Sequence, residues 1–243
     1  MERSFPHSTP SAITKPGGEY GRVIVVGAGA GGVIAAGRAA ERGAKVLLLE
    51  KTDGPGKKIL VSGKSRCNLT NARDLKDFFA MYGPNGRFLH GAFHRFFRDD
   101  LLAFLSLYGL ETKVERGGRI FPLSNDAADV VKAFRRYLAD HGVKLRTSVS
   151  VKGIAVRDGR VEGVLTQEGL LPAVAVILAT GGAAMPATGS TGDGYRMAAA
   201  VGHTVTKLRP ALVPLVVIEV ERAKSMRVSL SMAWVITIWT SCW

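Results

Sequence analysis

Cysteine is scarce in this chain of 243 residues, which has two, Cys67 and Cys242. Two distant cysteines without a C-x-x-C pair give neither a disulfide framework nor a redox or zinc motif, so no metal site is expected. Long apolar runs are also missing, and a run such as AVAVILA at 173–179 is far too short to span a bilayer. We therefore expect a cytoplasmic protein without a membrane partner.

The first twenty residues lack the apolar core that a secretory signal needs. They contain Pro, Ser and Gly instead, and we interpret residues 1–20 as a disordered leader. The remaining chain, in a sequence that is 47% hydrophobic, is long enough for one large domain or two small ones.

Acidic residues are outnumbered, with 20 Asp and Glu against 33 Lys and Arg, for a net charge of +13. Such an excess suits nucleic acid, an anionic membrane surface or phosphorylated ligands. The excess is spread evenly, since residues 1–100 carry 16 basic and 9 acidic side chains and the rest carry 17 and 11. No basic arm or stripe emerges, so we expect a small-molecule substrate and no nucleic-acid partner.

A strand, a glycine turn, a helix and a second strand follow one another within about thirty residues. RVIVVG at 22–27 predicts a buried strand, AGGVIAAGRAAERG at 30–43 a helix ended by Gly43, and KVLLLE at 45–50 another strand. This order predicts an α/β fold with a doubly wound, Rossmann-like parallel sheet.

The middle of the chain has the spacing of helices, and sheet returns after it. We expect helices over 88–109 and 124–142, the latter capped by Ser124, with a hairpin-like piece at 111–122 between them. Four strands are expected at 144–147, 151–158, 160–167 and 173–180, the middle two joined by a turn at Asp158-Gly159.

The glycine turn has the G-x-G-x-x-G spacing at Gly27, Gly29 and Gly32. The first glycine permits a tight turn, the second lets a pyrophosphate approach the backbone, and the third lets the helix pack closely on the strand. Glu50 ends the second strand, where a carboxylate can accept both ribose hydroxyls of an adenosine. The motif therefore predicts dinucleotide binding, and Glu50 disfavours a 2′-phosphate without deciding between FAD and NAD.

Two further segments help to decide between FAD and NAD. The first is the polar loop SGKSRCNLTN at 62–71, and the second is ATGGAAMPATGSTGDG at 179–194, in which a buried strand runs into a Gly-Gly turn. ATGG followed by TGDG resembles the flavin-binding pattern of the fumarate reductase and succinate dehydrogenase group. With GAGAGG, GKKILVSGKSRCNLTN and ERGGRIFPLS, the chain resembles the BaiN-like (YhiN-type) NAD(P)/FAD-dependent oxidoreductases over about residues 20–218.

The resemblance implies that the loop 62–71 wraps the flavin half of FAD, with Lys64 and Arg66 near its phosphates or the reduced flavin. It implies hydride transfer between flavin and NAD(P)H or a small organic substrate, with C=C reduction in some members and amine oxidation in others. Motif and resemblance together predict these cofactor-binding residues: Gly27, Gly29, Gly31, Gly32, Glu50, Lys51, Lys58, Ser62, Gly63, Arg66, Asn68, Val151, Thr180, Gly181, Gly182 and Asp193.

Three other residues have simpler interpretations. Cys67 could react if Arg66 lowers its pKa, but a buried, inert thiol is favoured. His203 follows the helix-ending Gly202 and precedes an expected strand, so a structural role is favoured over a catalytic one. For Arg119, in GRIFP, a position near the substrate and a position in a core hairpin are equally plausible.

The resemblance ends after LVPLVVIEVE, at about residue 220. We divide the chain into an FAD-binding domain at 21–210, containing a helical segment at 74–142, and an incomplete or divergent start of a β-rich substrate domain at 211–243. A truncation or frame shift near residue 220 is our hypothesis, and a short divergent member is the alternative. Truncation would leave the flavin exposed, which predicts weak FAD binding and leakage of electrons to oxygen, or a non-catalytic remnant.

Overall fold

The structure is a computed structural model that describes residues 21–208, without the side chains of residues 83–85. The expected leader at 1–20, the expected domain start at 211–243, the hypothesis of truncation and Cys242 all lie outside the described residues. None of the helices within residues 21–208 is long and apolar enough to cross a membrane.

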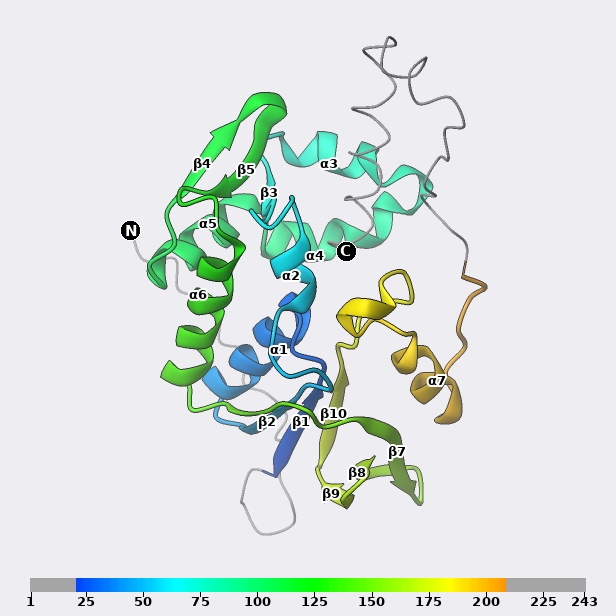
Figure 1. Cartoon of the computed structure of the whole chain (residues 1–243). Helices are drawn as coiled ribbons and strands as arrows, with labels where there is room; N and C mark the ends of the chain where they lie inside the picture. Colours follow the sequence, from blue (N-terminus) through cyan, green and yellow to red (C-terminus); the bar gives the residue numbers. More distant parts are fainter. Residues whose placement is uncertain (1–20, 209–243) are drawn as a thin grey trace, which may run out of the picture.

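A four-stranded parallel sheet forms the centre of the fold (Figure 1). Its order is β10 (Ala175–Leu178), β1 (Arg22–Val26), β2 (Lys45–Leu49) and β6 (Lys144–Arg146). Helix α1 (Ala30–Glu41) makes the crossover between β1 and β2, which pair in parallel from Arg22 opposite Lys45 to Val26 opposite Leu49. The parallel βαβ unit expected from the sequence is confirmed.

The two faces of this sheet are covered differently. Side chains alternate along β1, so that Val23 and Val25 face a core shared with α1 and α6 (Ala127–Asp140). Ile24 and Val26 face a second core that includes Val164 of β8 (Arg160–Thr166). Helices thus cover one face, while the small antiparallel sheet of β7 (Val151–Arg157), β8 and β9 (Gly169–Pro172), together with α7 (Asp193–Ala200), covers the other.

A second small sheet lies beyond the helix-covered face, and the polar loop leads directly into its strand β3. Its order is β3 (Thr70–Asn71), β5 (Arg119–Pro122) and β4 (Thr112–Glu115), all antiparallel. The hairpin expected at 111–122 is therefore confirmed, with the short 3-10 helix η2 (Arg116–Gly118) at its tip. Since β3 directly continues the loop 62–69, the hairpin and the loop share backbone hydrogen bonds, such as Leu69 N–H to the Ile120 carbonyl at 2.8 Å.

The remaining elements are short helices. They are α2 (Lys57–Val61), α3 (Leu75–Met81), the 3-10 helix η1 (Gly83–Leu89), α4 (His90–Arg95), α5 (Arg98–Leu107) and the 3-10 helix η3 (Pro186–Thr188).

The helix expected over 88–109 is wrong as a single element, because the chain is extended at Phe96 and Phe97 between α4 and α5. The Phe97 N–H donates to the Asp100 carboxylate at 2.8 Å, which starts a new helix there. The break lets the rings of Phe93 and Phe97 both pack edge-on against the buried Phe78, with centroids 6.1 and 4.9 Å away. Packing of aromatic side chains thus overrides the helical spacing.

Three smaller expectations also need correction. Helix α6 is capped by Asp126, whose carboxylate accepts the Ala128 N–H at 2.8 Å, and not by Ser124. The four strands expected between 144 and 180 are present, but β9 was missed between them. His203 is exposed, and no strand follows it as far as residue 208.

Candidate functional site

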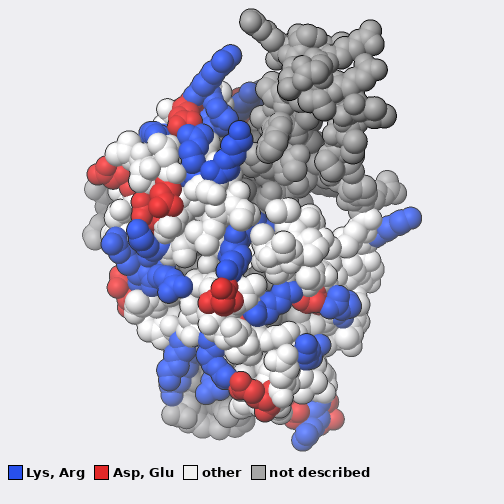
Figure 2. Space-filling view, viewed as in Figure 1, with Lys and Arg blue, Asp and Glu red and all other residues white. Residues whose placement is uncertain are grey.

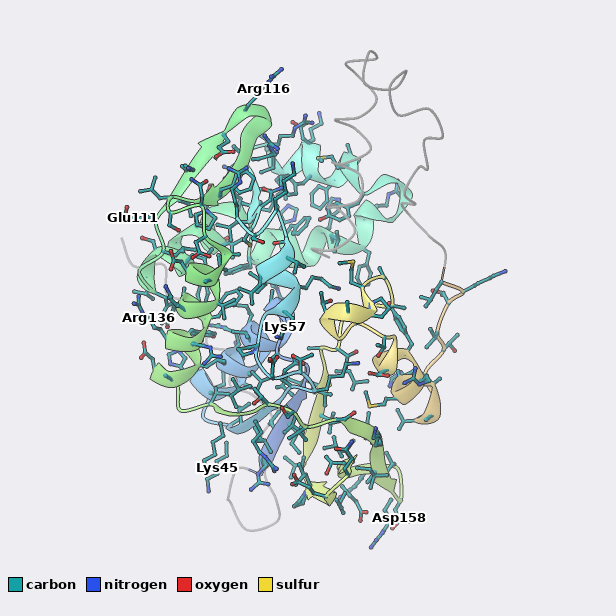
Figure 3. The ribbon with its side chains drawn as sticks, in the orientation of Figure 1. Lys45, Lys57, Glu111, Arg116, Arg136 and Asp158 are labelled. Carbon is teal, nitrogen blue, oxygen red and sulfur yellow. The ribbon has the colours of Figure 1, made fainter. Side chains whose placement is uncertain are left out.

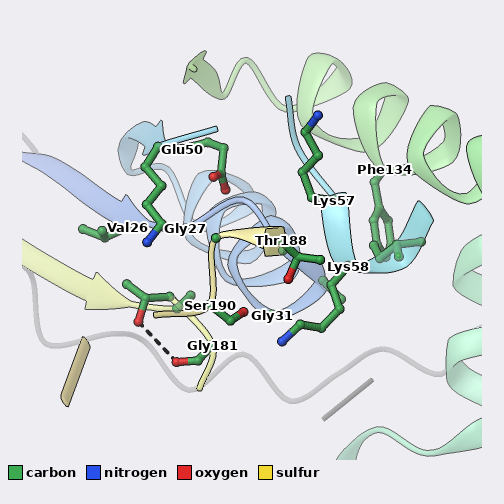
Figure 4. Close-up of a pocket in the computed structure, with 18 of the residues that line it drawn as sticks. Val26, Gly27, Gly31, Glu50, Lys57, Lys58, Phe134, Gly181, Thr188 and Ser190 are labelled. Atoms are coloured by element: carbon green, nitrogen blue, oxygen red, sulfur yellow. Dashed lines mark hydrogen bonds between the residues drawn. The ribbon is translucent and has the colours of Figure 1, made fainter. Parts of the chain in front are cut away.

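A cavity of about 440 Å³ opens at the carboxyl edge of the parallel sheet (Figure 4). Val26 and Leu49, at the ends of β1 and β2, and Ala179, just after β10, all line it. Ligands of open α/β sheets bind outside the carboxyl ends of the strands, because loops from several strands converge there. The position of the cavity is therefore that of a ligand site.

Most of the sequence-predicted site residues meet in this cavity. The lining includes Gly27, Gly29, Gly31, Glu50, Lys51, Lys58, Ser62, Asn68, Val151, Thr180, Gly181 and Asp193. Four predicted residues are not among those that line it: Gly32, Gly63, Arg66 and Gly182.

The four glycines of the turn divide into two kinds. A Cβ on Gly27 would lie 2.6 Å from the Ala179 carbonyl oxygen, and one on Gly32 would lie 1.7 Å from the Gly27 carbonyl oxygen. These two positions let the backbone segments pack together. A Cβ on Gly29 or Gly31 would meet nothing within 4 Å, although both residues line the cavity. The turn therefore leaves open space in front of the N-terminus of α1, where N–H groups and the helix dipole favour an anion.

Glu50 is fixed beside this turn. One carboxylate oxygen accepts the Ala28 N–H at 2.8 Å, and the other accepts the Thr52 N–H and hydroxyl, each at 2.9 Å. A carboxylate has about four acceptor positions, so it retains capacity for a ligand hydroxyl. Figure 4 shows Glu50 at the edge of the cavity, on the side of the glycine turn.

Lys51 and Asp193 join two loops across the cavity, the loop that follows β2 and the loop that leads into α7. The Lys51 ammonium lies 2.6 Å from the Asp193 carboxylate and 2.7 Å from the Thr191 hydroxyl, and Arg196 contacts the same carboxylate. The hydrogen bond from Lys51 is the main cause that lowers the pKa of Asp193 to about 2. Asp193 therefore stays ionised and links the end of β2 to the start of α7.

The loop after α2 presents a buried acceptor to the same cavity. The side-chain oxygen of Asn68 is buried without a hydrogen-bond partner, and Asn68 lines the cavity. A buried oxygen of this kind costs free energy unless a donor reaches it, so an N–H or O–H group that reached it would be bound favourably. Next to it, Cys67 is buried with 6% exposure, in agreement with the burial expected from the sequence, and it also lines the cavity.

Lys58 faces the cavity from the side of α2. A Cβ on Gly181 would lie 3.8 Å from its ammonium nitrogen, and Figure 4 shows Lys58 extended toward Gly181 and Gly31. A cation here lies close to both the glycine turn and the Gly-Gly turn after β10. It adds positive charge to the N-terminus of α1, where an anionic group would be stabilised.

The predicted residues outside the cavity have packing roles in this structure. A Cβ on Gly63 would lie 2.7 Å from the Asn68 backbone nitrogen, so glycine permits the tight loop. The Gly182 carbonyl accepts the Gly192 N–H at 3.1 Å. The Arg66 guanidinium binds Glu115 on β4 through two hydrogen bonds, of 2.9 and 3.2 Å.

Sequence reasoning missed the apolar wall of the cavity and several polar residues at its rim. The missed lining residues include Lys57, Leu101, Leu105, Val130, Phe134, Val149, Thr188 and Ser190. Leu105 and Val130 lie on amphipathic helices whose spacing predicted burial, but periodicity does not distinguish a core residue from a cavity wall. Lys57 adjoins the predicted Lys58, and Thr188 and Ser190 lie within the segment 179–194 singled out from the sequence, so nearness to predicted residues was the available signal.

A parallel sheet with an open glycine turn after its first strand and a carboxylate after its second defines a Rossmann-type dinucleotide-binding domain. The chain belongs to the HI0933-like family, since residues 21–234 match the family described as HI0933-like protein Rossmann domain. The expected resemblance to the BaiN-like oxidoreductases is thereby confirmed.

Among curated proteins, the chain is 38% identical over 204 residues to the 3-dehydro-bile acid delta(4,6)-reductase of Clostridium scindens, covering 80% of this chain and 47% of that protein. It is 30% identical over 192 residues to the ribosomal RNA dihydrouridine synthase of Escherichia coli, covering 79% of this chain and 47% of that protein. The chain thus spans about half the length of these relatives.

Solved structures share the fold at lower identity. The Mycobacterium smegmatis Sdh1 complex matches with a TM-score of 0.58 and 20% identity, over 76% of this chain and 39% of that one. A flavocytochrome c3 fumarate reductase matches with a TM-score of 0.56 and 22% identity, over 77% of this chain and 41% of that one.

Proposed function

We propose that the cavity binds FAD and that the protein is an FAD-dependent oxidoreductase. The observation that carries this proposal is the open space in front of Gly29 and Gly31 at the N-terminus of α1, next to the fixed carboxylate of Glu50. An anion at the turn and a ribose at Glu50 are the two requirements of an adenosine diphosphate half. The unpartnered oxygen of Asn68 gives the cavity a second recognition point for the flavin half.

Each group of residues has a role in this proposal. The backbone N–H groups of the turn, with Lys58 nearby, bind the pyrophosphate, and Glu50 accepts a hydrogen bond from a ribose hydroxyl. Asn68 accepts a hydrogen bond from the flavin side, while Lys51 and Asp193 keep the two loops together around the cofactor. Buried apolar side chains such as Leu105 and Val130 exclude water from the wall.

The reaction we infer is reduction of a carbon–carbon double bond in a small organic substrate, with NAD(P)H as electron donor. FAD supplies the two-electron carrier between donor and substrate. The choice rests on the relative from Clostridium scindens, whose name is that of a delta(4,6)-reductase of a 3-dehydro-bile acid. Amine oxidation, which the family resemblance also implied, has no such support among the curated relatives named above.

Ribosomal RNA is the second candidate substrate. The relative from Escherichia coli is named a ribosomal RNA dihydrouridine synthase, and the net charge of +13 suits a nucleic acid. Lys113, Arg116 and Arg119 lie on the hairpin β4–β5, and Figures 2 and 3 show basic side chains gathered there, with Arg116 at its tip. We rank this candidate second because its relative is less similar than the reductase and because Glu115 offsets part of the charge of the hairpin.

An FAD titration followed by anaerobic mixing with NADH or NADPH tests the proposal. We expect saturable FAD binding, retention of the flavin absorption bands through a desalting column, and loss of those bands when the donor is added. Addition of an enone or of a uridine-containing RNA then shows which substrate restores the oxidised spectrum. A colourless protein that cannot be reconstituted would favour a non-catalytic remnant over an enzyme.

A further inference from the structure

The loop between α2 and β3 has an unusual backbone. Lys64, Ser65 and Cys67 all have positive φ, at 57°, 63° and 58°, in addition to Gly63 at 55°. A non-glycine residue in this left-handed region costs of order 1 kcal/mol or more and persists only where the surroundings hold it there. Three such residues within four positions therefore require an external support.

The support comes from the hairpin β4–β5 through one side chain, Arg66. Its guanidinium makes a two-pronged ion pair with Glu115, at 2.9 and 3.2 Å, and also donates to the Asn125 side-chain oxygen at 3.2 Å. The same group lies 4.1 Å from the centre of the Phe121 ring. Paired prongs and ring stacking fix the direction of an arginine more firmly than a single hydrogen bond.

A further contact secures the backbone of the same loop. The Ser65 carbonyl accepts the Ala127 N–H at 2.9 Å, which ties the loop to the first residue of α6. Within the loop, the Cys67 N–H donates to the Ser62 carbonyl at 3.0 Å. Arg66 lies between these two contacts, so its pairing with Glu115 holds the middle of the strained segment.

Neither Arg66 nor Glu115 lines the cavity, whereas Asn68, two residues after Arg66, does. The side-chain oxygen of Asn68 is the buried acceptor that lacks a partner. The guanidinium already pairs with the Glu115 carboxylate, which the Lys113 ammonium also approaches at 3.8 Å. This arrangement suits a residue that fixes the position of its neighbours in the loop. It differs from the direct contact between Arg66 and a phosphate or the flavin that was expected from the sequence.

We propose that Arg66 and Glu115 are positioning residues, which hold the loop 62–68 so that Asn68 presents its oxygen to the flavin half of the cofactor. This inference rests on the FAD site proposed above. It assigns to the hairpin β4–β5 a role in flavin affinity although the ion-paired side chain of Glu115 does not reach the cavity.

The test compares the dissociation constants of FAD and of ADP for the wild type, Glu115→Ala, Arg66→Met and the double variant. ADP is the control ligand because it reaches the glycine turn and not the loop. We expect each single variant to weaken FAD binding about tenfold, which is about 1.4 kcal/mol, and to leave ADP binding within twofold. The double variant should bind FAD like the single ones, because both changes remove the same contact.

Two results would overturn the inference. If Arg66 touches the cofactor directly, Glu115→Ala frees its charge, and FAD affinity stays the same or rises while Arg66→Met lowers it. If the pair only stabilises the fold, affinities for FAD and ADP fall together. Glu162→Ala is the control for the loss of an ion pair elsewhere, since it breaks the more exposed pair with Arg157, at 3.1 Å, on the sheet β7–β9.

A measurement without cofactor separates failure of this inference from failure of the proposed function. Amide hydrogen exchange of Cys67 and Ala127 in the flavin-free protein should accelerate in Glu115→Ala and not in Glu162→Ala. Unchanged exchange contradicts the positioning role whether or not FAD binds. If the wild type binds ADP and not FAD while exchange accelerates as expected, the proposed cofactor is wrong and the mechanical role of the pair stands.

Discussion

The two sides of the cavity are built by different means. On the adenosine side, the glycine turn and Glu50 lie within 24 residues of one another and hold each other through local contacts, such as Ala28 N–H to Glu50 at 2.8 Å. On the flavin side, the loop 62–68 depends on Glu115, 49 residues away from Arg66 in the chain. The first side therefore takes its ligand-facing groups from one continuous segment, and the second depends on a side-chain contact with the distant hairpin β4–β5.

The largest expected effect separates the packing glycines from the open ones. Gly32→Ala places a Cβ 1.7 Å from the Gly27 carbonyl oxygen, so α1 must move away from β1. We expect a loss of about 3 kcal/mol or more in the free energy of unfolding, measured by urea titration.

Gly31→Ala is the matched control for that change, because its Cβ meets nothing within 4 Å. We expect the free energy of unfolding to be unchanged or up to about 1 kcal/mol higher, since alanine suits a helix better than glycine. Equal destabilisation by the two variants would show that the turn does not distinguish packing positions from open ones.

The next effect concerns the open position at Gly29. Gly29→Val fills space in front of the N-terminus of α1, where an added Cβ meets nothing within 4 Å, and the extended backbone, at φ −74° and ψ −177°, accepts a β-branched residue. We expect a folded protein, by circular dichroism, with FAD affinity reduced at least about a hundredfold, because the side chain occupies the place of the pyrophosphate. Retention of flavin at wild-type stoichiometry would mean that the open space serves no ligand.

Glu50→Gln should have a smaller effect on the same side. The neutral amide loses the charge from the ribose hydrogen bonds, and its NH₂ group must face either Ala28 N–H or Thr52 N–H, which both donate to the native carboxylate. We expect FAD binding weakened by about 1–3 kcal/mol and a slightly lower free energy of unfolding. An unchanged dissociation constant by fluorescence titration would place the ribose elsewhere.

The smallest predicted effect is the acid sensitivity of the link between Lys51 and Asp193. The pKa of Asp193 is lowered to about 2, so its ionised form stabilises the fold above its unfolded pKa, and this contribution disappears as the pH falls toward 2. Asp193→Asn should lower the free energy of unfolding by about 1 kcal/mol at pH 6. The difference between the wild type and the variant should shrink between about pH 4 and pH 2, as measured by urea titrations across that range.

The contrast between the two sides also explains what could be predicted from the sequence. The βαβ unit, the hairpin and the glycine turn at the cavity follow from local patterns, since glycine spacing and strand alternation act over a few residues. The role of Arg66 could not be predicted, because its partner Glu115 is distant in the chain and the sequence does not reveal which side chains meet. The break at Phe96 and Phe97 likewise depends on packing against Phe78, which helical periodicity does not encode.

A crystal structure of the protein with FAD would show where each half of the cofactor lies. We expect the pyrophosphate in front of Gly29 and Gly31, a ribose hydrogen-bonded to Glu50, and the flavin ring system beside Asn68, with Arg66 still paired to Glu115. The same cofactor bound in the opposite direction, bound outside this cavity, or absent at saturating concentration would contradict this expectation.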